Sequence, residues 1–87
     1  MKTIWKYELK ITDEQTISLP VNSKILSVQN FNGKLCLWAI VNSEDAEKER
    51  KIAIIGTGNP LWCNLKFWNF IDTVQMESGV WHVFSEY

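Results

Sequence analysis

The sequence predicts a mainly β protein, a compact antiparallel β barrel or sandwich of about seven short strands. Three observations predict this class. Apolar and polar residues alternate with a period of two along much of the 87-residue chain. Turn-forming residues recur roughly every 8–12 residues, and an Asn-Gly pair separates two apolar segments. We find no internal repeat and no linker in the sequence, so residues 1–87 are expected to form a single domain.

The first two strands are predicted over residues 3–11 and 15–19. In the first, Trp5, Tyr7 and two further apolar residues alternate with charged ones, which is typical of a half-buried strand. The second alternates in the same way and is closed by Pro20, because proline cannot donate to a sheet ladder.

A hairpin is predicted next, with arms over residues 24–29 and 34–41. Asn32-Gly33 lies between the arms, and this pair is the strongest short hairpin signal because both turn positions need a positive φ. Residues 35–41 are all apolar. We therefore expect the second arm to be a central strand that is covered on both faces.

Residues 43–51 are different, because seven of these nine residues are charged. Ser43 could cap one or two helical turns, and Glu44 precedes Lys48 at a helical i,i+4 spacing. The segment has no apolar face. Two expectations stay open for it: a short helix near residues 43–50, or a solvated loop.

The rest of the chain returns to strands. Residues 51–55 are predicted as a strand, 56–60 as a turn or loop, and 61–66 as irregular. Residues 67–76 and 80–84 are predicted as two further strands, with a turn at 77–79 between them.

Composition excludes several classes of function. The net charge of −1 argues against a protein that coats nucleic acid. The longest apolar run has seven residues, whereas a membrane-spanning helix needs about 20. The first residues lack the apolar core of a signal peptide, so we expect a cytosolic protein. Two cysteines are too few for a disulfide framework or a zinc site, and Cys36 is expected to be a buried apolar residue.

Five tryptophans in 87 residues are the unusual feature. Aromatic rings supply large buried areas to small cores, and they also stack on nucleic-acid bases. We expect most of the rings to be core, with one or two free for a ligand or partner. Trp5 and Tyr7 share one face of their predicted strand, and Lys6 adds a positive charge between them.

The segment Gly56, Thr57, Gly58 and Asn59 follows an apolar strand. Two glycines leave backbone N–H groups open to a phosphate or another anion. The ending of a phosphate-binding P-loop is missing, and a simple tight turn is the competing interpretation.

His82 is the single histidine, and no cluster of metal-ligating residues accompanies it at ligand spacing. A sheet-face residue is the ordinary interpretation. A Cys63–His82 dyad is the alternative that the sequence leaves open. Because no acid–base pair or metal set is visible, we expect neither an enzyme nor a cofactor or metal.

Several segments together resemble a small protein family common in bacteriophage genomes. The resemblance rests on Trp5-Lys6-Tyr7, Asp13-x-Gln15-Thr16-Ile17, residues 24–29 and 37–41, Gly56-Thr57-Gly58-Asn59-Pro60, residues 73–75, and Val80-Trp81-His82-Val83-Phe84. It covers nearly the whole chain except the charged segment and residues 61–67. Relatives often carry Pro at the position of Glu8 and His at the position of Asn59. An asparagine can keep a hydrogen bond there but not a charge.

The resemblance implies a phage accessory protein that acts against a bacterial defence in the cytoplasm of the infected host. The function that we expect from it is a non-enzymatic sponge, which binds a cyclic di- or trinucleotide messenger of bacterial immunity without cleaving it. Such sponges commonly hold their ligand between the subunits of a homo-oligomer. Two alternatives are a direct, anti-CRISPR-like inhibitor of a host defence protein and a minor virion or assembly component.

A sponge needs purine stacking and phosphate donors. The candidate ligand-binding residues are Trp5, Lys6, Tyr7, Gln29, Gly56, Thr57, Gly58, Asn59, Trp81 and His82. Trp5, Lys6 and Tyr7 are assigned to stacking and charge, the glycine segment to phosphate, and Gln29, Trp81 and His82 to base edges.

Overall fold

The computed structural model describes residues 1–86 and confirms the mainly β class. The described residues form seven strands and one three-residue 3-10 turn. The elements are β1 (Lys2–Leu9), β2 (Glu14–Pro20), β3 (Lys24–Phe31), β4 (Lys34–Asn42), β5 (Glu47–Gly56), η1 (Leu65–Phe67), β6 (Trp68–Met76) and β7 (Gly79–Glu86). Among residues 1–86, no helix has the length and hydrophobicity to cross a membrane.

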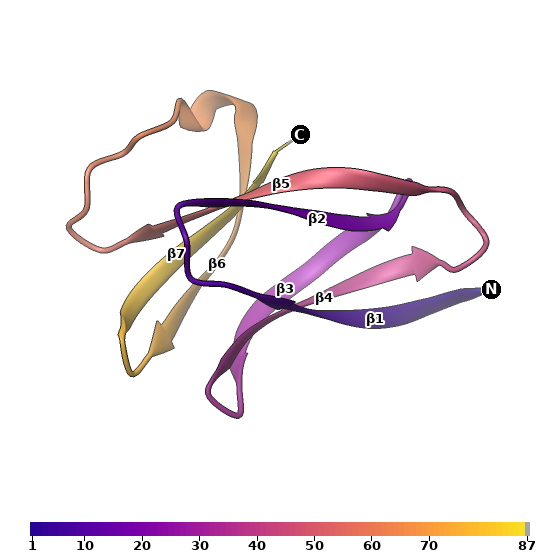
Figure 1. Ribbon diagram of the computed structural model, residues 1–87, viewed down its shortest axis with the longest axis horizontal. Coiled ribbons are helices and arrows are strands. Elements are labelled where there is room, and N and C mark those ends of the chain that lie inside the picture. Colours follow the sequence, from indigo (N-terminus) through magenta and orange to yellow (C-terminus); the bar gives the residue numbers. More distant parts are fainter. Residues whose placement is uncertain (87) are drawn as a thin grey trace.

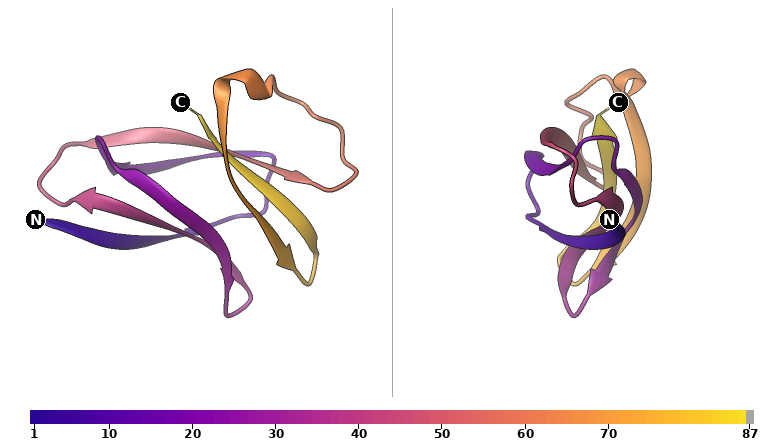
Figure 2. Two further views of the ribbon diagram at one scale, coloured as in Figure 1. Left: turned by 180° about the vertical axis from the view of Figure 1, so that it is seen from behind. Right: turned by 90° about the vertical axis from the view of Figure 1, so that its right-hand side faces the viewer.

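The strands make two antiparallel sheets that form a sandwich (Figures 1 and 2). One sheet has the order β1-β4-β3, and the other has the order β2-β5-β7-β6. Of the two predicted architectures, the sandwich is the one observed, because no backbone ladder among the described residues joins the two sheets. Side chains bridge them instead. The Val28 N–H donates to Oδ2 of Asp72 at 2.9 Å, and Nδ2 of Asn30 donates to the Gln75 carbonyl at 3.3 Å.

The core between the sheets is aliphatic. Its buried members are Leu9, Leu19, Val28, Leu35, Leu37, Ala39, Val41, Ile52, Ile54, Val74 and Val83. The expectation that most aromatic rings are core is wrong, since every Trp, Tyr and Phe in residues 1–86 is half-buried or exposed. The inner faces of the two sheets already fill the space with leucine, isoleucine and valine. The rings therefore lie around the core and on the outer faces.

The predicted hairpin is confirmed. Asn32 and Gly33 have φ values of 53° and 83°, as a two-residue turn of this kind requires. β4 is the central strand of its sheet, as expected. Its outer face is less covered than predicted: Cys36 is buried there, but Trp38 and Ile40 are only half-buried, because no second layer packs on that side.

The helix near residues 43–50 is not formed. Residues 43–44 are a turn, and β5 begins at Glu47. Glu47 to Arg50 pair with Pro20 to Ile17 of β2, and Val21 N–H donates to the Ala46 carbonyl at 2.8 Å. Pairing with β2 satisfies the backbone groups that a helix would otherwise satisfy. A helix here would have no apolar face to bury. A strand at the edge of the sheet can instead keep its charged side chains in solvent.

Candidate functional site

Two of the predicted site segments lie side by side at one end of the second sheet. Gly56, the last residue of β5, pairs with Trp81 of β7, and Ile55 pairs with His82. The Thr57 N–H extends the contact by donating to the Val80 carbonyl at 3.1 Å. Residues 56–59 and 81–82 therefore form one local site, although about 25 residues separate them in the chain.

Residues 56–59 form a hydrogen-bonded turn. The Asn59 N–H donates to the Gly56 carbonyl at 3.0 Å, and Gly58 has a φ of 88°. A positive φ at the third position is the mark of a type II turn, which favours glycine there. The Gly58 N–H makes no hydrogen bond to another described residue, and Gly58 is exposed. The turn thus presents one free backbone donor to solvent.

The ring of Trp81 fixes this turn from the inner side of the sheet. A Cβ atom at Gly56 would lie 2.8 Å from Cζ3 of Trp81 and 2.8 Å from Nδ2 of Asn59, so glycine is required by close packing. The indole Nε1 donates to Oγ of Ser78 at 3.1 Å. Trp81 is half-buried and packs against the core. Trp81 therefore supports the turn by packing against it.

His82 lies on the outer face of the sheet between two threonines. Oγ1 of Thr57 lies 2.7 Å from Nε2, and Oγ1 of Thr73 on β6 lies 2.9 Å from Nδ1. A neutral imidazole has one donor and one acceptor nitrogen, so one threonine hydroxyl accepts and the other donates. Each hydroxyl keeps hydrogen-bonding capacity beyond its bond to the ring. This set of three side chains, the Thr57–His82–Thr73 trio, is the most connected polar group on the outer face.

The trio is suited to binding. Its third member is a neutral hydroxyl, whereas a hydrolytic triad places a carboxylate there to stabilise the imidazolium. Cys63 does not join it, since both ring nitrogens of His82 are bonded to threonines. Burial and the nearby Glu14 carboxylate raise the pKa of the Cys63 thiol. No group of three or more His, Cys, Asp or Glu side chains within residues 1–86 is placed to hold a metal.

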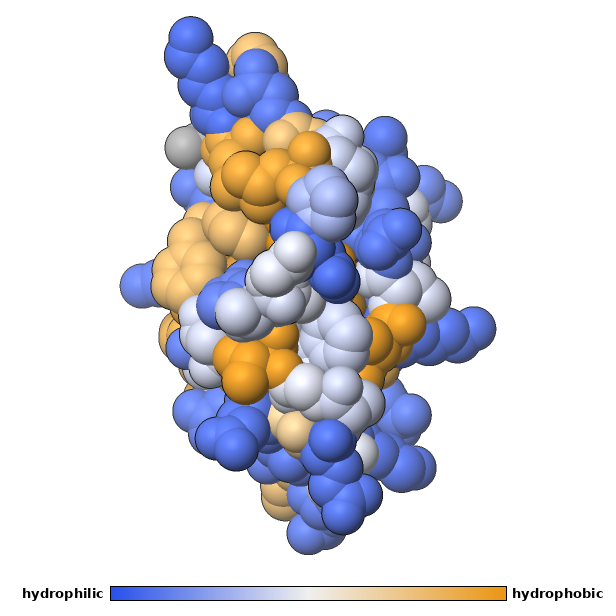
Figure 3. All heavy atoms as spheres, turned by 90° about the vertical axis from the view of Figure 1, so that its left-hand side faces the viewer, coloured by the Kyte–Doolittle hydropathy of each residue, from blue (hydrophilic) through white to orange (hydrophobic). Residues whose placement is uncertain are grey.

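An aromatic stripe continues from the trio along the same outer face. Phe84 is two residues from His82 on β7, and its ring lies 5.5 Å from that of Phe70 on β6. Trp68 lies two residues before Phe70 and contacts Trp62 edge-on, with ring centroids 6.1 Å apart. Phe70 is 58% exposed and Trp62 is 43% exposed. Figure 3 views the end of the molecule that carries residues 57–67 and shows hydrophobic areas left open between hydrophilic ones.

The structure places Trp5, Lys6 and Tyr7 away from this site, on the other sheet. Trp5 and Tyr7 pair with Ala39 and Leu37 on the inner face, whereas Lys6 lies on the outer face. Nζ of Lys6 is 4.6 Å from the centre of the Phe31 ring, which makes a cation–π contact. The buried hydroxyl of Tyr7 has no partner among the described residues, and burial and Glu47 raise its pKa.

Gln29 lies nearer to the trio than its sequence position indicates. It lines a groove of about 270 Å³ between β3 and β6, together with Asn30, Asp72, Thr73 and Gln75. Thr73 is therefore shared between the groove and the trio. Thr73 is thus the residue that connects the groove lined by Gln29 with His82.

Sequence reasoning missed Thr73, Phe70 and Phe84 as site residues. Thr73 and Phe70 face His82 and Phe84 directly across the β6–β7 pair. The signal that could have found them is the turn at residues 77–79. It fixes the register of this pair, and the register places alternate residues of both strands on one face.

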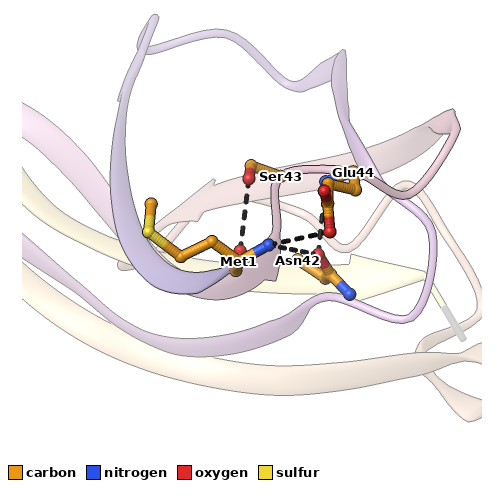
Figure 4. A network of polar contacts seen from close by, with 4 residues as sticks. All are labelled: Met1, Asn42, Ser43 and Glu44. Atoms are coloured by element: carbon orange, nitrogen blue, oxygen red, sulfur yellow. Dashed lines mark hydrogen bonds and ion pairs between the residues drawn. The ribbon is translucent and has the colours of Figure 1, made fainter.

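A second polar network lies at the opposite end of the molecule (Figure 4). The Met1 amino group lies 3.1 Å from Oδ1 of Asn42 and 3.2 Å from Oε2 of Glu44. The Ser43 N–H donates to the Met1 carbonyl at 2.9 Å. Met1 and Glu44 are both highly exposed. The network fastens the start of β1 to the β4–β5 turn, and exposed ion pairs of this kind contribute about 0–1 kcal/mol to stability.

Comparison with known families gives one match. The model of the family described as "Domain of unknown function (DUF7352)" matches residues 1–87. No curated protein and no solved structure matches the chain.

Proposed function

Because the chain belongs to the DUF7352 family, whose description assigns no activity, we propose a function from the site itself. The protein is a non-enzymatic sponge that binds a cyclic di- or trinucleotide at the Thr57–His82–Thr73 trio. In this proposal it serves a phage in the cytoplasm of an infected bacterium, where it withdraws a messenger of host immunity. The setting comes from the sequence resemblance to phage proteins.

The observation that carries the proposal is the convergence of neutral donors around His82. The free Gly58 N–H belongs to the turn that sets the Thr57 hydroxyl against the imidazole. Both ring nitrogens are bonded to threonines, and the hydroxyl that accepts the ring N–H keeps its own O–H for a ligand. Backbone N–H groups in turns and side-chain hydroxyls are common phosphate donors. A phosphate at the trio needs no rearrangement of the turn, since the glycines and Trp81 already hold it in shape.

The aromatic stripe supplies the second element of a nucleotide site. Residues two apart on a strand are about 6.6–6.8 Å apart, so Phe84 and its neighbour Phe70 lie one step along the sheet from His82. An aromatic ring gives about 1–3 kcal/mol per stacked base. The exposed face of Phe70 is therefore the proposed platform for a base.

Size supports binding between two copies of the chain. The groove beside Thr73 has a volume of about 270 Å³, whereas sites that enclose a small-molecule ligand usually measure about 300–1,000 Å³. One chain would leave much of a dinucleotide in solvent. A second copy that packs its own stripe over the ligand would enclose it and bury the exposed rings. We therefore include a homo-oligomer in the proposal.

The test is a thermal-shift screen of the full chain against cyclic di- and trinucleotides, followed by heat release and analysis of the bound nucleotide. A ligand that binds only the folded state raises the melting temperature by mass action. We expect a rise of several degrees with at least one nucleotide, which is recovered intact. No rise with any of them, or recovery of a cleaved product, would overturn the proposal.

A second candidate is direct inhibition of a host defence protein. It is favoured by exposed apolar side chains on residues 61–67, where Leu61 is 63% and Phe67 is 62% exposed. Large exposed apolar side chains are typical of protein interfaces. Capture of one defined host polypeptide that is lost on Phe67→Ser, with no thermal shift from any nucleotide, would favour this candidate over the sponge.

A further inference from the structure

Arg50 lies at the end of the sandwich opposite the glycine turn and has unused hydrogen-bonding capacity. It is the sole arginine of the sequence and is half-buried near the start of β5. Its Nη2 donates to the Ser23 carbonyl at 3.1 Å. A guanidinium has five N–H donors, and within residues 1–86 Arg50 makes no ion pair and no other side-chain hydrogen bond.

A cleft of about 560 Å³ opens over Arg50, between β3 and β6. This volume lies within the range of about 300–1,000 Å³ that is usual for small-molecule sites. Apolar side chains line it from both strands, among them Leu26 on β3 and Phe70 on β6, which are 43% and 58% exposed. The polar residues that line the cleft with Arg50 include Lys24 and Asn69.

The strands that border the cleft are both irregular at this point. The register of β3 shifts between Ile25 and Ser27, and that of β6 shifts between Phe70 and Asp72. Such bulges redirect side chains and are frequent beside functional sites. Here the extra residues are Leu26 and Ile71, and both line the cleft. Two bulges that face one cleft indicate that its shape is built into the sheet edges.

The charges at the cleft favour an anion. Arg50 and Lys24 are the cations, and Glu86 is the one carboxylate among its lining residues. The hydroxyl groups of Ser23 and Ser85 are already engaged, since they donate to the carbonyls of Pro20 and Glu86. The free donors are thus the guanidinium, the Lys24 ammonium and the Asn69 amide. A guanidinium fork matches the two oxygens of a phosphate or carboxylate.

We propose that this cleft binds an oxyanion, a phosphate or a carboxylate, that is carried on a flat apolar group. The oxyanion is held by Arg50 and Lys24, and the apolar group rests against Leu26 and Phe70. The oxyanion end of this site, at Arg50 and Lys24, is distinct from the Thr57–His82–Thr73 trio, and the inference does not depend on the proposed function, although both sites use the Phe70 ring. The two sites meet at Phe70, which lies at the edge of the cleft and in the aromatic stripe.

The test is a titration of the full-length protein, labelled with nitrogen-15, followed by nuclear magnetic resonance in a buffer without phosphate. The probes are phenyl phosphate, benzoate and inorganic phosphate. We expect saturable shifts at the amides of Ile25, Leu26, Asn69 and Ile71 with the first two probes. Inorganic phosphate should bind more weakly because it has no apolar group to contact Leu26 and Phe70. The stronger of the first two probes identifies the oxyanion.

Variants separate a built site from general charge attraction. Arg50→Gln should weaken phenyl phosphate binding about ten-fold or more, since a charge-assisted pair contributes about 1.5–3 kcal/mol. Arg50→Lys should give an intermediate loss, because it keeps the charge without the fork. Lys48→Gln removes the same charge from β5 outside this cleft and should change little.

If Arg50→Gln unfolds the protein, the exposed Lys24→Gln takes its place and should weaken binding by a factor of about three or more, near the lower end expected for a hydrogen bond. Three results would overturn the inference. The first is that no probe gives saturable shifts. The second is that the cleft variant, Arg50→Gln or Lys24→Gln, loses no more affinity than the Lys48→Gln control, and the third is that the shifts are confined to Thr57, Gly58 and His82.

Discussion

The Thr57 hydroxyl lies 2.7 Å from Nε2 of His82, although 25 positions separate the two residues in the sequence. The contact exists because β5 pairs with β7 until Gly56 and Trp81, which brings the glycine turn over the end of β7. A bond from Thr73 to the other ring nitrogen completes the trio. The position of the imidazole is thus fixed from the glycine turn and from β6, and the proposed ligand site is formed before any ligand arrives.

Gly56→Ala is expected to destabilise the protein by about 1–3 kcal/mol, the usual cost of overpacking. The added Cβ would lie 2.8 Å from both the Trp81 ring and the Asn59 amide. Chemical denaturation measures the loss. The control is Gly33→Ala, where nothing lies within 4 Å of the new Cβ and only the positive φ is strained. A Gly56→Ala variant as stable as the wild type would show that the ring does not close over the turn.

Tyr7→Phe is expected to stabilise the protein by about 1 kcal/mol. The buried Tyr7 hydroxyl has no partner in residues 1–86, and an unsatisfied buried polar group usually costs about 1–3 kcal/mol. Thermal and chemical denaturation at neutral pH measure the change. A loss of stability would mean that the hydroxyl has a partner, such as a buried water.

The same residue predicts a dependence of stability on alkaline pH. Burial, and then the Glu47 carboxylate, raise the pKa of Tyr7 above its usual value of 10.0. Above about pH 10 the unfolded chain loses this proton while the folded protein keeps it, so stability should fall as pH rises. Below pH 10 both states keep the proton and the contribution is constant. Tyr7→Phe should fall less steeply than the wild type above pH 10, and equal slopes would contradict the assignment.

Cys63 is expected to react slowly with alkylating reagents at pH 8, although it lies in a loop. Burial and the Glu14 carboxylate raise its pKa, and the thiolate is the reactive form. Glu14→Gln should increase the rate, while the buried Cys36 should stay unreactive in both proteins. Mass spectrometry of the alkylated peptides follows each thiol separately. A Cys63 rate at or above that of an unstructured cysteine peptide would contradict this account.

Phe70→Ser is expected to reduce self-association, because it removes the most exposed ring of the aromatic stripe. The control is Phe31→Ser, which removes another exposed ring, one that lies outside the stripe against Trp38. Sedimentation equilibrium over a range of concentrations measures the mass. A monomeric wild type, or equal losses in the two variants, would remove the homo-oligomer from the proposal.

Local patterns predicted much of the fold. Alternation, the Asn32-Gly33 turn and the central strand β4 all depend on residues that are close in sequence, and all are observed. The short helix failed for a tertiary reason. Residues 47–50 form backbone hydrogen bonds with β2. Nothing in the charged segment itself predicts pairing with a strand that lies so far away in the sequence.

The site was predicted only where the chain itself marked it. The two glycines and His82 are rare residues and drew attention to the segments that meet. Thr73 and Arg50 are ordinary by type, and their roles depend on strand pairing and on two facing bulges. The prediction that Trp5 and Lys6 contact the same ligand failed, because neighbouring residues on a strand point to opposite faces of the sheet.

The central claim is that the trio binds a cyclic nucleotide, and calorimetric titration of the wild type beside Thr57→Val tests it most directly. Valine keeps the shape of threonine but removes the hydroxyl that contacts His82. We predict that at least one cyclic di- or trinucleotide binds the wild type and that Thr57→Val binds it about ten-fold more weakly, as expected for the loss of one charge-assisted hydrogen bond. Binding by neither protein, or equal binding by both, would contradict the account.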